Sequence, residues 1–333
     1  MTYQNIGIIG AGAWGTALAQ TAAKAERTVE IWAYEPAVVE SINYDHENRL
    51  YLEGITLDPS IRATGEIEAV IDFADLLILA LPAQKTAAVL SGLSLEPDND
   101  CPVLIASKGI ETKTGRFLSQ VVRGFWSEVP IGILSGPSFA SEVGNGRPTA
   151  VTIAMPNQHQ SIGYEACKAL SHLTFRPYFT DDIIGAQVGG ALKNVIAIAC
   201  GVAEGRGMGR NARAAIQTRG LAEIVRYGEA FGADPETFLG LSGLGDLTLT
   251  CNSEESRNFS FGTRLGKGET PQSIFESGNN VIEGVHTAEA VIKQADKRGI
   301  EMPICRSVYE AVQGKRKIEY IIKGLLERPI TEE

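Results

Sequence analysis

Short, uninterrupted apolar runs recur along the first half of the chain, and stretches with apolar residues at every third or fourth position separate them. Such runs are typical of strands buried on both faces, and helical periodicity between them favours a parallel sheet covered by helices. The runs predict strands at 6–9, 29–32, 75–82, 102–106, 131–134, 151–154 and 175–179. The intervening patterns predict helices at 16–23, the beginning of 39–51, 67–73, 83–90 and 115–125. We therefore expect a doubly wound α/β domain over residues 1–182, with its ligands at the carboxyl ends of the strands.

The pattern changes at Ile183, where strand-like runs stop and long helical periodicities take over. These periodicities predict helices at 186–203, 212–231, 235–239, 287–298 and 307–312. We expect an all-α second domain over residues 183–333, after a hinge at 180–182. The space between two such domains is the default position for an active site.

Glycines at positions 10, 12 and 15 follow the first predicted strand and lead into the first predicted helix. A G-x-G-x-x-G pattern is weak by itself, but here it has the strand and the helix that a dinucleotide site needs. Gly10 permits the tight turn, Gly12 lets a pyrophosphate approach the backbone, and Gly15 lets helix and strand pack closely. Free N–H groups and the positive end of the helix dipole supply the anion site. The sequence therefore predicts a Rossmann-type fold that binds a dinucleotide, in preference to a glycine-rich turn without a ligand.

The charge balance limits the classes of partner. The 333 residues are 44% hydrophobic and 21% charged, which is ordinary for a globular enzyme. The formal net charge is −10 and the isoelectric point is about 5.1. Such a field repels nucleic acid and anionic membranes, so we expect neither as a partner. An anionic substrate then needs locally clustered cations.

Cysteine and histidine usage indicates the compartment. The five cysteines are far apart without a Cys-x-x-Cys pair, and the four histidines lack metal-ligand spacing. We therefore expect no disulfide framework and no metal site. Residues 1–5 lead directly into the first strand without a signal-peptide pattern, and apolar runs such as 76–82 are too short to span a membrane. These features predict a soluble, cytoplasmic protein.

Two loops of the first domain carry candidate ligand-binding residues. Lys108 directly follows the predicted strand 102–106, so it lies at a carboxyl end of the sheet. A lysine there can meet a phosphate or a substrate oxygen, although a solvated loop lysine is an equal alternative. Gly136 and Ser138 follow the strand 131–134, and such small residues suit a close approach of the backbone to a ligand, or an ordinary turn.

Lys193 is the most unusual residue of the second domain. Its neighbours at helical spacing are Gly189, Gly190, Ile196 and Ala197, in an almost uncharged stretch. A lysine on such a face is either desolvated, which lowers its pKa and suits it to proton transfer, or it snorkels to water. The residues leave both alternatives open.

Further candidates follow in the second domain. Asp246 places a carboxylate in a glycine-rich turn. Residues 256–258 (Ser-Arg-Asn) combine a guanidinium with hydroxyl and amide donors, which is good phosphate-binding chemistry. We expect 262–268 to be a solvated connection, whereas 278–284 has the composition of a ligand-facing loop.

Taken together, these segments closely resemble the bacterial soluble NAD(P)-dependent glycerol-3-phosphate dehydrogenases. Nine segments match in family order, across nearly the whole chain: 10–15, 107–111, 134–140, 191–195, 211–215, 218–221, 243–246, 256–258 and 281–284.

The resemblance implies an activity and a set of site residues. It implies interconversion of sn-glycerol 3-phosphate and dihydroxyacetone phosphate with NAD or NADP, in supply of phospholipid synthesis. Lys193 matches the family's proton acceptor, and Asp246 would hold the lysine or a substrate hydroxyl in place. The substrate-contacting positions match Lys108, Gly136, Ser138, Lys193, Asp246, Ser256, Arg257 and Asn258. The cofactor-contacting positions, beside the three motif glycines, match Trp14, Tyr34, Lys108, Ala140, Arg257, Val281 and Glu283.

The sequence departs from the family pattern at two places. Many relatives carry arginine just after the second strand, where a 2′-phosphate would lie, but this chain has Tyr34 and Glu35 there. Glu35 lies about where a ribose-binding acid is expected, so we expect NADH to be used at least as well as NADPH. Arg206 and Arg210 stand where relatives are usually less basic, and the sequence gives no role for them.

Two other readings stay open at this level. A related β-hydroxyacid or 6-phosphogluconate-type dehydrogenase also pairs a nucleotide domain with a helical domain and a catalytic lysine. A non-catalytic NAD(P)-binding regulator would have lost Lys193 or Asp246, and both are present. The sequence does not decide the oligomeric state, and a homodimer stays open.

Overall fold

The computed structural model describes residues 3–278 and 281–326 and divides into two compact units. The first unit comprises Met1–Lys108 and Arg116–Gln187, and the second comprises Gly109–Gly115 and Val188–Glu333. The short segment Gly109–Gly115 therefore belongs to the second unit, although it lies in sequence between two strands of the first.

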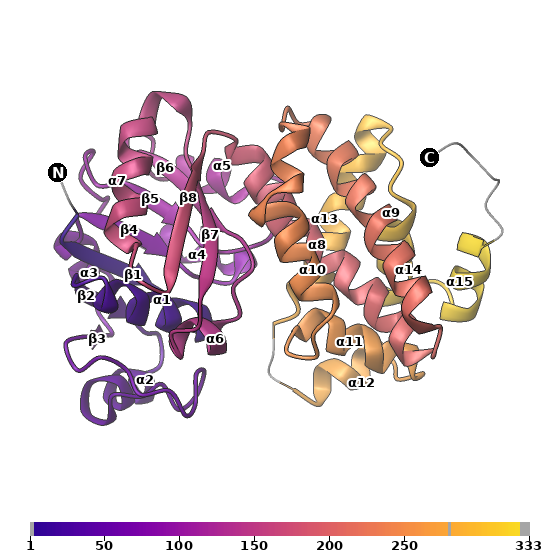
Figure 1. The fold of residues 1–333 in the computed structure, drawn as a ribbon, viewed down its shortest axis with the longest axis horizontal. Helices are drawn as coiled ribbons and strands as arrows, with labels where there is room; N and C mark the ends of the chain where they lie inside the picture. Colours follow the sequence, from indigo (N-terminus) through magenta and orange to yellow (C-terminus); the bar gives the residue numbers. More distant parts are fainter. Residues whose placement is uncertain (1–2, 279–280, 327–333) are drawn as a thin grey trace. The chain divides into compact units, whose positions relative to one another are not determined.

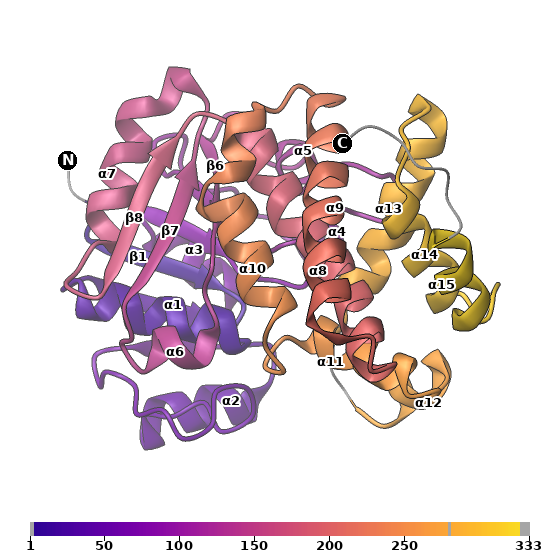
Figure 2. The same ribbon diagram turned by 45° about the vertical axis from the view of Figure 1, so that its right-hand side comes forward.

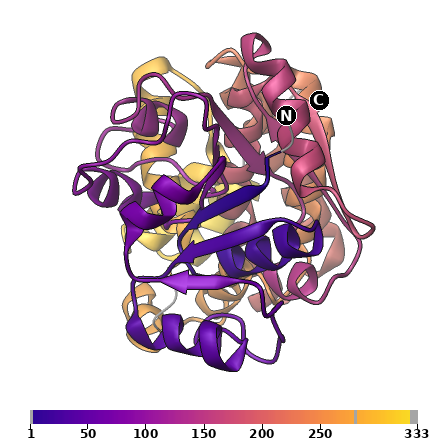
Figure 3. The same ribbon diagram turned by 90° about the vertical axis from the view of Figure 1, so that its left-hand side faces the viewer.

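An eight-stranded sheet forms the centre of the first unit, with the strand order β3-β2-β1-β4-β5-β6-β7-β8 (Figures 1 and 3). All neighbouring pairs are parallel except β6 and β7, which are antiparallel. The strands are β1 Asn5–Ile9, β2 Thr28–Trp32, β3 Arg62–Thr64, β4 Leu76–Leu79, β5 Val103–Ile105, β6 Ile131–Ser135, β7 Thr149–Ala154 and β8 Phe175–Thr180.

Helices cover both faces of this sheet because its strands are apolar on both faces. One apolar core takes Ile6 and Ile8 of β1 together with side chains of α1, α6 and α7, and α7 lies along β8 (Figure 2). The other core takes Leu77 and Leu79 of β4 together with side chains of α3, α4 and α5. The helices are α1 Ala13–Lys24, α2 Pro36–Glu40, α3 Ile67–Phe73, α4 Thr86–Leu90, α5 Leu118–Arg123, α6 Ala140–Gly144 and α7 Gln160–Leu170.

This architecture confirms the predicted doubly wound α/β domain. The seven predicted strands are present, while β3, α6 and α7 were not predicted. β3 is a three-residue edge strand without an apolar run, and its pairing with β2 is what makes it a strand. The helix expected at 115–125 is shorter and begins only at Leu118.

Apart from Gly109–Gly115, which form no helix, the described part of the second unit consists of helices and their connections. Its helices are α8 Ile183–Gly205, α9 Gly209–Glu229, α10 Asp246–Cys251, α11 Arg257–Gly266, α12 Pro271–Glu276, α13 Glu283–Arg298, α14 Pro303–Val312 and α15 Ile318–Leu326. A 3-10 helix, Pro235–Leu239, and a π-type turn, Leu241–Gly245, lead into α10. The prediction of an all-α second part is confirmed.

Glycines bring α8 and α11 into close contact. A Cβ atom added at Gly201 would lie 2.1 Å from the Phe259 carbonyl oxygen, and one added at Gly262 would lie 2.1 Å from that of Ile198. The prediction that 262–268 is a solvated connection is therefore wrong for Gly262–Gly266, which form the last half of α11. Glycine disfavours an isolated helix, but here it permits the helix axes to approach.

α8 is long and apolar enough to cross a membrane by length and composition. However, 83% of its apolar window is buried inside the structure. Such burial is typical of a core helix rather than of a membrane span.

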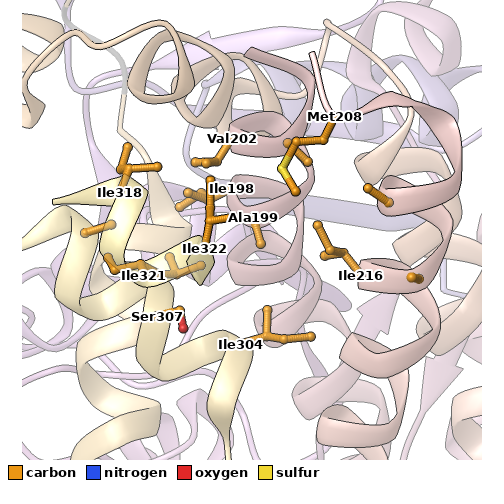
Figure 4. Close-up of a pocket in the computed structure, with 15 residues that line it drawn as sticks. Ile198, Ala199, Val202, Met208, Ile216, Ile304, Ser307, Ile318, Ile321 and Ile322 are labelled. Atoms are coloured by element: carbon orange, nitrogen blue, oxygen red, sulfur yellow. The ribbon is translucent and has the colours of Figure 1, made fainter. Parts of the chain in front are cut away.

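Aliphatic side chains of α8, α9, α14 and α15 enclose an apolar pocket of about 190 Å³ in the second unit (Figure 4). Ile198 of α8, Ile216 of α9, Ile304 of α14 and Ile322 of α15 line it. An ion pair between Arg206 and Glu319 joins the end of α8 to α15, which gives Arg206 a structural role.

Candidate active site

The three motif glycines have different surroundings at the turn between β1 and α1. Gly10 has φ +117°, and a Cβ atom there would lie 2.8 Å from the Ala80 carbonyl oxygen. A Cβ atom at Gly15 would lie 1.8 Å from the Gly10 carbonyl oxygen, so only glycine fits. A Cβ atom at Gly12 would have no described atom within 4 Å. Gly12 also precedes α1 without a side-chain cap, so the open position coincides with free N–H groups at a helix N-terminus.

A residue that the sequence did not single out forms hydrogen bonds with the glycine-rich turn between β1 and α1. Asn48 is fully buried, and its Nδ2 donates hydrogen bonds to the Ala11 carbonyl oxygen and to Thr16 Oγ1, both at 2.8 Å. A buried amide with both partners satisfied fixes the backbone around it. Asn48 lies in a polar stretch with no periodic pattern, so no sequence signal distinguished it.

The structure brings Lys108, Gly136 and Ser138 together at the carboxyl ends of the neighbouring strands β5 and β6. Lys108 Nζ donates to the Gly136 carbonyl oxygen at 2.8 Å and lies 3.5 Å from Ser138 Oγ. Gly136 has φ +131°, a conformation that favours glycine, and this turns its carbonyl toward the lysine. The three residues thus present an ammonium, a hydroxyl and a backbone group at one edge of the sheet.

The other cofactor candidates of the first unit lie around the same edge. Trp14 is in the first turn of α1, and its buried Nε1 has no hydrogen-bond partner among the described residues. A buried donor without a partner costs free energy unless a ligand satisfies it. Tyr34 follows β2 and is 80% exposed, and Ala140 is the first residue of α6. An open glycine, an uncapped helix and an unsatisfied donor suit a dinucleotide.

In the second unit, Lys193 of α8 forms a buried ion pair with Asp246 of α10. The residues are 7% and 0% exposed, and Lys193 Nζ lies 2.5 Å from Asp246 Oδ1. Lys193 Nζ also donates to Thr250 Oγ1 at 2.9 Å, and that hydroxyl lies 3.4 Å from Asp246 Oδ1. The lysine is therefore desolvated but paired, and it does not reach water as a snorkelling side chain would.

The small residues next to Lys193 explain how the carboxylate reaches it. A Cβ atom added at Gly189 would lie 2.3 Å from the Ser242 carbonyl oxygen. The absence of a side chain at Gly189 thus allows the π-type turn before α10 to pack directly on α8. Thr250 is one helical turn after Asp246, so both face the lysine. Sequence reasoning missed Thr250, because nothing in its pattern separates it from an ordinary helical threonine.

Residues Ser256, Arg257 and Asn258 begin α11 but have different surroundings. Ser256 is the N-cap and accepts a hydrogen bond from the Phe259 N–H at 3.2 Å. Arg257 is exposed, and no hydrogen bond or ion pair to it is formed within the described chain. Asn258 is buried, and its amide joins Asn194 to the first turn of α13.

The bonds of Asn258 connect three helices. Its Nδ2 donates to Asn194 Oδ1 at 2.9 Å, and its Oδ1 accepts from the Gly284 N–H at 2.9 Å. Glu283 is the first residue of α13, and Val281 before it is 38% exposed. The segment 278–284 that the sequence indicated as ligand-facing is described except for 279–280, which lie outside the described residues.

Thiols and metal ligands do not add to this chemistry. All five cysteines are free and buried. Burial, and the neighbouring Cys200 thiol, raise the pKa of Cys251 well above its ordinary value, which keeps the thiol protonated and unreactive. Within residues 3–278 and 281–326, no group of histidine, cysteine and acidic side chains could hold a metal ion.

Comparison with known proteins identifies the family. Residues 5–161 match the model of the NAD-dependent glycerol-3-phosphate dehydrogenase N-terminus, and residues 182–323 match that of the C-terminus. The glycerol-3-phosphate dehydrogenase [NAD(P)+] of Parvibaculum lavamentivorans is 47% identical over 333 residues, which cover 100% of this chain and 99% of the relative. The relative of the same name from Caulobacter vibrioides is 45% identical and is covered completely.

Solved structures agree with this assignment. A glycerol-3-phosphate dehydrogenase from Coxiella burnetii superimposes with a TM-score of 0.92 and 34% identity, over 98% of this chain and 99% of that one. A D-mandelate dehydrogenase, with a TM-score of 0.64 and 16% identity, shares the fold alone. The hydroxyacid-dehydrogenase alternative is thereby set aside, and this chain belongs to the family of NAD-dependent glycerol-3-phosphate dehydrogenases.

Proposed function

We propose that this chain interconverts sn-glycerol 3-phosphate and dihydroxyacetone phosphate with NAD(H) or NADP(H), and that Lys193 transfers the proton. The observation that carries the role of Lys193 is its buried pairing with Asp246 and Thr250. A permanently placed ammonium in a site with little water is suited to meet an alkoxide, because its interaction with developing charge is strong there. The wider role that we propose is supply of glycerol 3-phosphate to phospholipid synthesis, and we further propose that the chain acts in the cytoplasm.

The chemistry divides between the coenzyme and the protein. A bound nicotinamide supplies or accepts the hydride at the carbonyl carbon of the substrate. Lys193 donates a proton from Nζ to the oxygen of dihydroxyacetone phosphate as negative charge develops on it, and in the opposite direction it accepts the proton of the C2 hydroxyl. Asp246 and Thr250 hold the ammonium in one orientation, which avoids reorganisation during the reaction.

Cations at the candidate binding positions compensate the acidic charge of the chain. Arg257 is exposed and its planar guanidinium can hold a phosphate through two parallel hydrogen bonds. We assign the substrate to Lys108, Gly136, Ser138, Lys193, Asp246, Ser256, Arg257 and Asn258. We assign the dinucleotide to Gly10, Gly12, Trp14, Gly15, Tyr34, Lys108, Ala140, Arg257, Val281 and Glu283. We further propose that the boundary between the two domains lies after residue 182 and that the chain assembles as a homodimer.

Oxidation of reduced coenzyme by the purified chain tests the proposal. Dihydroxyacetone phosphate should support oxidation of NADH or NADPH, and removal of the Lys193 ammonium should slow this oxidation at least about 100-fold without loss of coenzyme binding. Unphosphorylated dihydroxyacetone is the control for the phosphate requirement. Oxidation with 3-keto acids and none with dihydroxyacetone phosphate would refute the proposed substrate.

A further inference from the structure

The connection between β2 and β3, residues 36–61, lies outside the glycine motif but is firmly packed in the first unit. A Cβ atom added at Gly144 of α6 would lie 3.0 Å from Ile55 Cδ1 and 3.2 Å from Leu52 Cδ2. Leu52 and Ile55 also belong to the apolar core that contains side chains of β1 and α1. The connection therefore lies on the same face of the sheet as α1 and α6 (Figure 2).

Within this connection, Asn48 bridges the two sides of Gly12. Its Nδ2 donates to the Ala11 carbonyl oxygen before Gly12 and to Thr16 Oγ1 in α1, both at 2.8 Å. The Thr16 N–H in turn donates to the Gly12 carbonyl oxygen at 3.0 Å. The amide has one favourable orientation, because the Ala11 carbonyl oxygen can only accept and the NH2 group must therefore face it. Both amide hydrogens are thus directed at the glycine-rich turn.

The backbone of the connection holds Asn48 in place. The Tyr51 N–H donates to Asn48 Oδ1 at 3.1 Å, and the Leu52 N–H donates to the Asn48 carbonyl oxygen at 2.8 Å. Two residues earlier, His46 has φ +52°, a left-handed conformation that is uncommon for a residue with a side chain. The Leu57 N–H fixes this bend by donating to the His46 carbonyl oxygen at 2.7 Å. Such a conformation persists only where the surrounding structure determines it, and here it directly precedes the contact with the glycine-rich turn.

We propose that Asn48 is a positioning residue for the coenzyme, which keeps the N–H groups around Gly12 in the conformation that binds a pyrophosphate. Reorientation of these N–H groups on binding would reduce affinity, so a turn that is already fixed binds more tightly. Because the Asn48 side chain is fully buried, it acts through the turn and not by contact with the ligand. The inference rests on the proposed function only in that a dinucleotide binds this turn.

Calorimetric titration with ADP-ribose measures binding of the pyrophosphate without the nicotinamide. Asn48→Leu keeps the approximate volume of the side chain and removes its three hydrogen bonds. We expect this variant to bind ADP-ribose at least about fivefold more weakly than the parent, which corresponds to the net contribution of one hydrogen bond. In steady-state assays the KM for NADH should rise by a similar factor, whereas kcat and the KM for dihydroxyacetone phosphate should stay within about twofold of the parent.

Asn43 provides a matched control in the same connection. Its amide also makes two hydrogen bonds, to the backbone carbonyl oxygen and from the N–H of Ala63, both at 2.8 Å. None of its hydrogen bonds within the described chain reaches the glycine-rich turn. Asn43→Leu should therefore lower the free energy of unfolding in urea denaturation, as Asn48→Leu does, but leave the affinity for ADP-ribose within about twofold of the parent.

Thr16→Val tests the same role from the side of α1, because it removes the hydroxyl that accepts from Asn48. It should weaken ADP-ribose binding, and the double variant Asn48→Leu/Thr16→Val should lose less affinity than the two single losses combined, since both residues act through one network. Unchanged ADP-ribose affinity in Asn48→Leu, or an equal loss in Asn43→Leu, would overturn the inference. If Asn48→Leu does not fold, unchanged affinity in Thr16→Val would overturn it. Failure of the dihydroxyacetone phosphate assay with these affinity differences intact would instead refute the proposed substrate.

Discussion

Replacement of Lys193 by methionine removes the ammonium and keeps most of the volume of the side chain. Because Lys193 is 7% exposed and Asp246 is 0% exposed, the change leaves a carboxylate buried without its cation. Breaking a buried ion pair on one side costs about 3–5 kcal/mol of unfolding free energy. Loss of proton transfer and of alkoxide stabilisation should also reduce turnover by at least about 100-fold, or about 2.7 kcal/mol in the barrier.

The double variant Lys193→Met/Asp246→Leu separates these two effects. It removes both charges, and apolar replacements of buried ion pairs are often neutral or stabilising. We therefore expect urea denaturation to show most of the lost stability restored in the double variant, whereas turnover stays at least as low as in the single variant. Calorimetric binding of NADH should be nearly unchanged in both.

Two outcomes would refute this reasoning. If Lys193→Met kept turnover within a few-fold of the parent, Lys193 would not transfer the proton. If the double variant were destabilised as strongly as the single variant, the cost would come from packing rather than from an unpaired carboxylate. The same protein samples serve both measurements.

Three further predictions follow from the other sites. Arg257→Ala should raise the KM for dihydroxyacetone phosphate by about 10- to 1,000-fold and affect dihydroxyacetone much less; equal losses would assign the residue to the cofactor or the fold. Gly12→Ala should fold normally but lose at least about tenfold in NADH affinity, whereas Gly15→Ala, whose Cβ would lie 1.8 Å from a carbonyl oxygen, should lose more than about 2 kcal/mol in urea denaturation. Burial raises the pKa of Glu223 above 4.5, so the contribution of this carboxyl group to the free energy of unfolding is fully present below pH 4.5 and is lost as pH rises through the folded-state pKa. The variant Glu223→Gln should therefore gain stability relative to the parent between pH 4 and pH 7. A difference in unfolding free energy that does not change with pH would contradict this.

The sequence predicted elements whose signal is local. Strands β1, β4 and β5 are buried on both faces, so their apolar residues stand in unbroken runs that need no knowledge of the partner. β3 has no such run, because its structure comes from pairing with β2. The glycines of α11 misled the prediction, because glycines in the sequence indicate the end of a helix. Only the close contact with α8 makes glycine favourable at these positions.

The same distinction holds for the candidate site. The apolar neighbours of Lys193 marked it as unusual, but its partner lies 53 residues away in sequence, so the choice between burial and exposure could not be made from the chain alone. Asn258 was predicted among the phosphate-binding residues by its donor chemistry. In the structure its amide already has two partners, Asn194 and Gly284, which no spacing rule indicates.

The grouping of Gly109–Gly115 with the helical unit affects how this protein can be taken apart. Thr112 Oγ1 donates to the His286 carbonyl oxygen, and Gln294 Nε2 donates to that of Thr114, so the segment is bonded to α13. A fragment beginning at residue 183 would lack this piece of its own fold. A chimera in which the nucleotide-binding half comes from a relative therefore has to keep residues 109–115 of this chain. A single splice point would replace these residues, which belong to the helical unit.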